Sequence, residues 1–244
     1  CSWTSCIPSW VPAGLRAQIG QHAENAYFGK PSGLMDQMAS SVGGLVAIDF
    51  GQEEAQVQAL PFSFAASGYR LIVVDTRGSH DDLTPAYSAI QKEMQAVARA
   101  LGAETLRERD KAALMDKLPQ IRQATSDRAI LRALHFYHEN ERVEQAVAAL
   151  KASDLPLFFR MVRESGLSSW TMLQSLYAHP GSQPLALALA AAGEVLGEEG
   201  ACRVHGGGFA GTTLNFVPEH KLGAFVACMD ALFGEEACHV LDVR

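Results

Sequence analysis

Apolar residues recur at helical or strand spacing through most of the chain. Repeats of three and four positions, as in Ile90, Met94 and Val97, predict amphipathic helices, and short apolar runs bounded by glycine or polar residues predict strands. We expect helices over residues 15–28, 34–43, 84–101, 127–150, 155–164, 183–196 and 219–232, and strands over residues 45–50, 57–60, 69–75, 201–205, 212–217 and 238–243.

These elements indicate an α+β protein. Residues 51–56 are polar and suit the turn of a hairpin. The C-terminal order strand, loop, strand, helix, strand predicts an antiparallel sheet with helices on one face, and no regular βαβ repeat is visible. Thr84 is expected to cap the helix that follows it, with Pro85 at the first helical position. Leu15 and Ile19 share one face of the first helix.

Composition and charge narrow the class of protein. The 244 residues are 48% hydrophobic and 19% charged, which is ordinary for a globular chain of one large or two small domains. The net charge of −7, with no Lys/Arg-rich block, argues against binding to nucleic acid or to an anionic membrane. Neither a membrane span nor a secretion signal is recognisable, so we expect a cytoplasmic protein.

The cysteines and the first residues carry little chemistry. CSWTSCIPSW, residues 1–10, has no helical or strand period, and we expect an atypical segment such as a processed tag, a truncation or a reading-frame scar. The cysteines form no CxxC pair and are odd in number, so free thiols are expected and no metal site is predicted. The five are Cys1, Cys6, Cys202, Cys228 and Cys238.

Asp36 is the most informative single residue. In GKPSGLMDQM it follows a glycine by three positions, where a loop becomes a helix. If Ser32 caps that helix, the carboxylate lies in the first turns, where exposed N–H groups keep it ionised. Gly33 would let a ligand approach the backbone, and the carboxylate could then hold or deprotonate a sugar hydroxyl. Taken alone, a solvated first-turn acid is the simpler interpretation.

HGGGFAG, residues 205–211, contains a GxGxxG pattern at Gly206, Gly208 and Gly211. A strand-like run follows it, without Lys-Ser/Thr, so neither a dinucleotide-binding fingerprint nor a Walker loop is predicted. Consecutive glycines still cost chain entropy on ordering. A tight turn between strands and a backbone that approaches a phosphate or another loop are equally good interpretations.

Other polar positions have plainer explanations. SGLSSW, residues 165–170, looks like a serine-rich phosphate loop, but helix-like residues follow, so we treat the match as accidental. Tyr87 lies on the inward stripe of its helix, where core packing with a partner for its hydroxyl is expected. A polar stripe on the long helix favours a solvated or salt-bridged face. Its members are Arg132, His135, Glu139 and Arg142.

Taken together and in order, these segments resemble the galactokinases of the GHMP kinase superfamily. AENAYFGKPSGLMDQMASSVGG is similar to the family's G-x-M-D-Q segment, and RVHGGGFAGT to its late G-G-G-F-G-G motif. VVDTRGSHDDLTPAYSAIQKEM and RALHFYHENERV match the intermediate strand with its helix start and the R-x-x-H-x-x-x-E-N-x-R helix. The resemblance covers nearly everything from about Gln18 onward and implies a GHMP-kinase fold.

The resemblance also implies a reaction and residue roles. It implies ATP-dependent phosphorylation of galactose or a related hexose at the anomeric hydroxyl, with Mg²⁺ and with Asp36 as the catalytic aspartate. Gly33 and Tyr87, with Asp36, fall where the family contacts the sugar. No residue of this chain is assigned as a metal ligand. The glycines expected beside the phosphate-binding loop are Gly206, Gly207 and Gly208.

The chain departs from the family pattern in several places. Ala210 replaces a motif glycine, His205 replaces a usual threonine, and ESGLSSWTMLQ lacks the histidine and acidic pair common there, which leaves the sugar open. The G-R-x-N-x-x-G-E-H-x-D-Y and P-x-x-x-G-L-S-S-S-A motifs, expected before Gln18, do not occur in the printed sequence. We expect residues 11–66 to be the remainder of an N-terminal domain, residues 67–244 to be the C-terminal domain, and the chain to be truncated and inactive or severely crippled.

Other functions stay open. A non-catalytic sugar-binding or regulatory relative would bind sugar saturably without turnover, and a folded remnant would do neither. A GHMP kinase acting on another sugar would differ only in substrate. Expected partners are a small-molecule sugar and ATP, without nucleic acid or membrane, and a homodimer could form through an exposed sheet edge.

Overall fold

The structure is a computed structural model that describes residues 11–27, 29, 32–52, 54–78, 83–177, 179–209 and 211–243. The atypical segment 1–10, with Cys1 and Cys6, and the departure at Ala210 lie outside these residues. The chain divides into two compact units, Cys1–Ser63 with Asp242–Arg244 and Phe64–Leu241, and each is described by itself. The assignment of residues 11–66 and 67–244 to two family domains stays a prediction.

The first unit holds two helices followed by a hairpin, as the hydrophobic spacing predicts. Its two strands pair antiparallel, from Leu45 opposite Leu60 to Asp49 opposite Gln56. The elements are α1 (Ala13–Tyr27), α2 (Met35–Val42), β1 (Leu45–Asp49) and β2 (Gln56–Leu60).

Helix α1 does not turn its larger apolar residues toward α2. Ala17 is fully buried, and a Cβ built on Gly20 would lie only 3.6 Å from the Gln37 side chain. Leu15 and Ile19, which share the apolar face seen in the sequence, are 48% and 44% exposed. The small residues lie in the contact because they allow the two helix backbones to approach closely.

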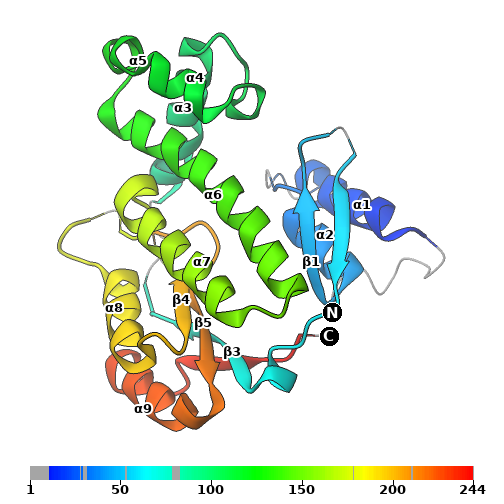
Figure 1. Cartoon of the computed structure of the whole chain (residues 1–244), viewed down its shortest axis with the longest axis vertical. Helices are drawn as coiled ribbons and strands as arrows, with labels where there is room; N and C mark the ends of the chain where they lie inside the picture. Colours follow the sequence, from blue (N-terminus) through cyan, green and yellow to red (C-terminus); the bar gives the residue numbers. More distant parts are fainter. Residues whose placement is uncertain are drawn as a thin grey trace. The chain divides into compact units, whose positions relative to one another are not determined.

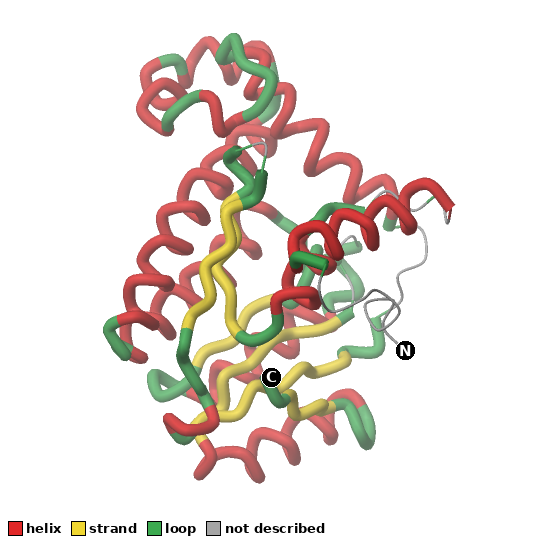
Figure 2. The backbone as a smooth tube through the Cα atoms, turned by 90° about the vertical axis from the view of Figure 1, so that its right-hand side faces the viewer, coloured by secondary structure: helices red, strands yellow, loops and turns green. Residues whose placement is uncertain are grey.

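The second unit is built on a four-stranded antiparallel sheet with the order β4–β5–β3–β6 (Figure 2). Its central pair, β3 and β5, runs from Tyr69 opposite Pro218 to Asp75 opposite Thr212. The antiparallel sheet expected from the strand pattern is therefore present. The strands are β3 (Tyr69–Asp75), β4 (Ala201–Val204), β5 (Thr212–Pro218) and β6 (Cys238–Leu241).

The long helices of this unit were predicted from apolar spacing, and the short ones were not. Helix α3 begins at Thr84 with Leu83 at the cap position, so Thr84 is its first residue and not its cap. Residues 103–126, for which no element was predicted, hold α4 and α5, which are too short to show a period. The local signal there is Asp110, whose side chain accepts the N–H of Ala113 at 2.8 Å.

In chain order the helices of the second unit are α3 (Thr84–Ala100), α4 (Lys111–Asp116), α5 (Leu118–Ala124), α6 (Asp127–Lys151), α7 (Leu155–Ser168), α8 (Pro184–Leu196) and α9 (Leu222–Phe233). Short 3-10 turns are η2 (Ala65–Ser67), η3 (Leu106–Glu108) and η5 (Glu219–Lys221). The segment η4 (Ser169–Leu173), directly after α7, is a π-helical turn.

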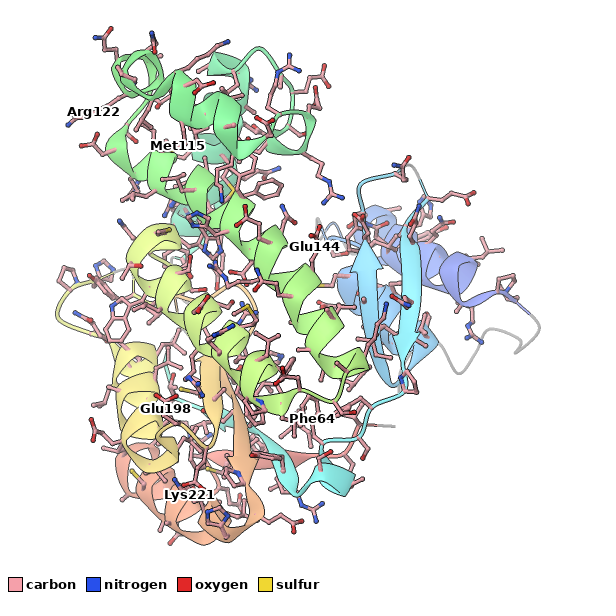
Figure 3. The ribbon with its side chains drawn as sticks, viewed as in Figure 1. Phe64, Met115, Arg122, Glu144, Glu198 and Lys221 are labelled. Carbon is pink, nitrogen blue, oxygen red and sulfur yellow. The ribbon has the colours of Figure 1, made fainter. Side chains whose placement is uncertain are left out.

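Helices cover both faces of the sheet, which corrects the expectation of one covered face (Figure 1). Helices α8 and α9 pack on one face, in a cluster that contains Ile72 and Val217. On the other face, Phe158 of α7 lies with its ring centroid 5.2 Å from that of Phe216, and Phe64 joins this cluster (Figure 3). Phe216 and Val217 are neighbours on β5 and point to opposite faces, so both are buried.

The turn before β4 gives a test of this packing. A Cβ on Gly200 would lie 2.5 Å from the Phe216 carbonyl oxygen, whereas one on Gly193, within α8, would meet no atom within 4 Å. We expect Gly200→Ala to lower the free energy of unfolding by about 1–3 kcal/mol through overpacking. Gly193→Ala should raise it by about 0.5–1 kcal/mol through helix propensity. Urea unfolding measures both, and equal effects of the two substitutions would contradict the packing.

Candidate functional site

Asp36 lies exposed in the first turn of α2, within the first unit. Ser32 does not cap this helix, contrary to the prediction: its N–H donates to Asn25 Oδ1 of α1 at 2.8 Å, and Leu34 occupies the cap position without a side-chain hydrogen bond. The first N–H groups of α2 therefore lack a side-chain cap and favour a nearby negative charge. A Cβ on Gly33 would meet no atom within 4 Å, so the backbone beside Asp36 is open to a ligand.

In the second unit, HGGGFAG connects the paired strands β4 and β5, as the turn interpretation predicts. The connection is closed by the His205 N–H, which donates to the Thr212 carbonyl at 2.9 Å. Its backbone is left-handed at Gly206 (φ 74°), Gly208 (φ 85°) and Phe209 (φ 62°). A side chain in that region costs roughly 1–2 kcal/mol, so tertiary contacts must hold the backbone at Phe209.

Two residues far apart in the sequence contact this loop. The Tyr87 hydroxyl donates to the Gly208 carbonyl at 2.7 Å, and the Tyr87 ring lies edge-on to Phe209 with centroids 5.2 Å apart. A Cβ on Gly207 would lie 2.7 Å from the Tyr87 ring, and one on Gly208 would overlap the Ser175 carbonyl oxygen. That oxygen also accepts the Phe209 N–H. The glycines are needed because other chain segments lie against them, so the close-approach interpretation holds together with the turn.

Tyr87 is exposed and is not a core residue, which corrects the expectation of core packing. The residue is 36% exposed, and its hydroxyl has the partner that was expected. Partial burial raises the pKa of Tyr87 above its usual value, which keeps the hydroxyl protonated and able to donate.

The polar stripe of α6 is buried at two of its residues and half-buried at the other two, Glu139 and Arg142, so it is a salt-bridged face and not a solvated one. Arg132 is 2% exposed and His135 is 7% exposed. Arg132 pairs with Glu93 of α3 at 2.9 Å, and Arg142 pairs with Glu139 at 2.9 Å. The stripe is covered because α3 and α7 both pack against α6.

Two serines of SGLSSW, Ser165 and Ser168, contact this stripe. The segment is helical and not a loop, since it spans the end of α7 and the start of η4. Ser165 Oγ donates to Glu139 Oε1 at 2.5 Å, and Ser168 Oγ lies 2.9 Å from His135 Nδ1. Their spacing of three residues, opposite a polar stripe, was the available signal for this contact.

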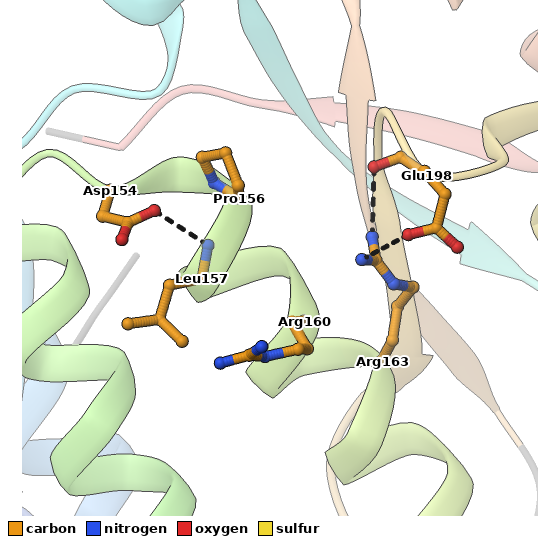
Figure 4. A pocket seen from close by; sticks show the side chains of 6 residues that line it. All are labelled: Asp154, Pro156, Leu157, Arg160, Arg163 and Glu198. Atoms are coloured by element: carbon orange, nitrogen blue, oxygen red, sulfur yellow. Dashed lines mark hydrogen bonds and ion pairs between the residues drawn. The ribbon is translucent and has the colours of Figure 1, made fainter.

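A groove that the sequence did not predict lies at the start of α7 (Figure 4). Its volume is about 500 Å³. Three of its charged side chains already have partners among the lining residues: Asp154 accepts the Leu157 N–H at 3.0 Å, and Arg163 pairs with Glu198 at 3.0 Å. The groove offers binding surface and no nucleophile. Its lining residues are Asp154, Pro156, Leu157, Arg160, Arg163 and Glu198.

Two absences hold for the described ranges of the chain. No three His, Cys, Asp or Glu side chains there come together in a way that could hold a metal ion. Within the same ranges, no helix is both long and apolar enough to cross a membrane. Cys202, Cys228 and Cys238 are free thiols.

Comparison with known proteins identifies relatives, although no family model matches the chain. A galactokinase of Actinobacillus pleuropneumoniae (serotype 5b, strain L20) is 30% identical over 217 residues, which are 87% of this chain and 54% of that protein. A galactokinase of Streptomyces coelicolor is 30% identical over 227 residues, 90% of this chain and 56% of that protein. The chain is a relative of the galactokinases.

This galactokinase relative spans about half the length of the curated proteins it matches. Its fold is similar to that of Lactococcus lactis galactokinase in a complex with galactose, with a TM-score of 0.77 and 21% identity over 96% of this chain and 60% of that one. It is also similar to L. major mevalonate kinase in a complex with R-mevalonate, with a TM-score of 0.60 and 15% identity over 93% and 57%. The α+β, GHMP-kinase-like fold predicted from the sequence is thereby confirmed.

The buried histidine of this galactokinase relative gives a pH prediction. Burial lowers the pKa of His135 to about 4, and the positive charges of Arg142 and Arg203 act in the same direction, against Glu139. His135 takes up a proton near pH 6.5 in the unfolded chain and only near pH 4 in the folded chain. The neutral side chain therefore makes its full contribution to the free energy of unfolding above pH 6.5, and this contribution is lost as the pH falls toward 4.

We therefore expect the free energy of unfolding to fall by up to about 3 kcal/mol between pH 7 and pH 4 because of His135. His135→Gln should remove this part of the pH dependence. The exposed His239→Gln serves as the matched control and should leave the dependence unchanged. Urea unfolding across this range measures the slope, and identical slopes in wild type and His135→Gln would rule out the assignment.

Proposed function

We propose that the protein acts as a galactokinase-type sugar kinase, which transfers the γ-phosphoryl group of ATP to the anomeric hydroxyl of galactose or a related hexose. The observation that carries the proposal is the contact of Tyr87 with the glycine loop. It brings the residue expected to contact the sugar against the loop expected beside the phosphates. The names and folds of the relatives support the same reaction class.

The proposed roles follow from the exposed polar groups. Asp36 is exposed at an uncapped helix start and would accept the proton of the sugar hydroxyl, or orient that hydroxyl, as its oxygen attacks the phosphorus. Tyr87 uses its proton in the bond to Gly208, and its oxygen lone pairs remain able to accept a bond from a second sugar hydroxyl. Gly33 would leave room for the sugar beside the backbone.

ATP would lie beside the glycine loop. A Cβ on Gly206 would meet no atom within 4 Å, so one side of the loop is open to another backbone or to a phosphate. Gly207 lies against the Tyr87 ring, and Gly208 lies against Ser175, so these two positions have no such open space. Mg²⁺ is the expected metal of such a kinase. The described residues hold no cluster of His, Cys, Asp or Glu suited to a metal.

The proposal is tested by sugar-dependent ADP release with Mg-ATP and a panel that includes galactose and N-acetylgalactosamine. The 244 residues are assayed alone and fused behind the N-terminal segment of the S. coelicolor galactokinase, since two motifs expected before Gln18 do not occur in the printed sequence. We expect little release from the chain alone, galactose-dependent release from the fusion, and at least a hundredfold loss on Asp36→Asn because the proton acceptor is removed.

Asp116→Asn is the matched control, since Asp116 is an exposed acid at the end of α4. It should leave ADP release unchanged. Release that survives Asp36→Asn would sink the catalytic assignment. Saturable galactose binding without release in either form would favour the regulatory sugar-binding alternative, and release with another sugar would favour a different GHMP kinase. A cytoplasmic location and a homodimer remain predictions of the sequence.

A further inference from the structure

We propose that Arg132 is a positioning residue for the glycine loop, residues 206–208. Its guanidinium group ties α3, which carries Tyr87, to the end of η4, two residues before Ser175, and Tyr87 and Ser175 hold that loop. This role deepens the proposed function, and rests on it for the loop's part in the reaction. The contacts that define it lie within the second unit and can be tested without a substrate.

The loop needs to be held from outside. Phe209 has a left-handed backbone that an L side chain disfavours, and no regular secondary structure fixes it. Its N–H is bound by the Ser175 carbonyl, and the Gly208 carbonyl is bound by the Tyr87 hydroxyl. If either Tyr87 or Ser175 moved, the loop would lose one of these two bonds and the backbone could relax.

Arg132 controls the Tyr87 side through α3. Tyr87 and Glu93 lie on this helix six residues apart, and Arg132 Nη1 pairs with Glu93 Oε2 at 2.9 Å. Glu93 also pairs with Arg128, one turn earlier on α6, at 2.6 Å. Helix α3 is thus fastened to α6 less than two turns after the residue that contacts the loop.

Arg132 controls the Ser175 side through the π-helical turn. Its Nε donates to the Leu173 carbonyl at 3.0 Å, at the last residue of η4. Gln174 then takes a left-handed backbone (φ 57°), and Ser175 follows, fully buried, with its N–H donated to the Ser169 carbonyl at 3.2 Å. The last carbonyl groups of a helical segment have no partner within it, so the Arg132 bond to Leu173 helps to fix where Ser175 lies.

The two bonds need the shape of arginine and not only its charge. Arg132 is 2% exposed and remains charged, because the pKa of arginine is far above neutral although burial lowers it. The planar guanidinium presents Nε to Leu173 and Nη1 to Glu93 at the same time. A lysine ammonium at this site is a single point charge on a flexible stem and cannot reproduce both directions.

Amide hydrogen exchange of the loop tests this role. Arg132→Lys keeps the charge and loses the fork, and Glu93→Gln keeps the shape of the partner and loses its charge. We expect the peptide that contains the Phe209 amide to exchange at least tenfold faster in both variants than in wild type. Tyr137→Phe is the control, because it removes from the same helix a buried 3.1 Å hydrogen bond that leads to the Leu106 carbonyl of η3 and not to the loop.

The comparison is made relative to global stability, measured for each variant by urea unfolding. Faster loop exchange in Tyr137→Phe to the same extent, or unchanged exchange in both Arg132→Lys and Glu93→Gln, would overturn the proposal. If Arg132→Lys does not fold, Glu93→Gln decides alone. A second readout uses Tyr87→Phe, which already lacks the hydrogen bond through which α3 acts on the loop. Adding Glu93→Gln to this variant should speed loop exchange less than Glu93→Gln does in wild type. Fully additive effects of the two substitutions would count against the role.

The outcome is independent of the kinase assay. A loop that loosens as expected in a protein without sugar-dependent ADP release would support the positioning role and remove the proposed function. An unchanged loop in a protein whose ADP release depends on Asp36 would do the reverse.

Discussion

Gly208 can lie against the Ser175 carbonyl only because it has no side chain. A Cβ there would overlap the carbonyl oxygen, and the backbone is left-handed at φ 85°. The approach lets the same oxygen accept the Phe209 N–H, and it places the Gly208 carbonyl within 2.7 Å of the Tyr87 hydroxyl. The connection of β4 to β5, the start of α3 and the end of the π-helical turn therefore meet at one stretch of backbone, and the candidate chemistry of the second unit depends on it.

Much of the fold could be predicted, because elements with a buried face repeat their apolar residues at a fixed period. The hairpin, the central strands and the long helices follow from this rule. The rule of apolar spacing failed on α1, where the small residues are the ones in contact. The contact face carries Ala17 and Gly20, and the larger Leu15 is exposed. The unbroken apolar run of residues 71–74 in β3 was a sign of a sheet covered on both faces, which the order of elements concealed.

The candidate site was predictable where a motif is local and not where partners are distant. Asp36 in a first helical turn and the glycine loop between two strands could both be read from neighbouring residues. The Arg132–Glu93 pair joins residues 39 positions apart, and charged side chains are usually solvated, so a surface stripe was the reasonable expectation. Ser175 had no signal at all, because what matters there is its backbone carbonyl.

The central proposal is that the exposed Asp36, beside the open backbone of Gly33, binds a sugar hydroxyl. A titration of the ¹⁵N-labelled chain with galactose, followed by amide chemical shifts, tests it most directly. The account predicts saturable shifts at Gly33 and Asp36. Shifts confined to the groove at the start of α7, or no saturable shift in a folded chain, would contradict it.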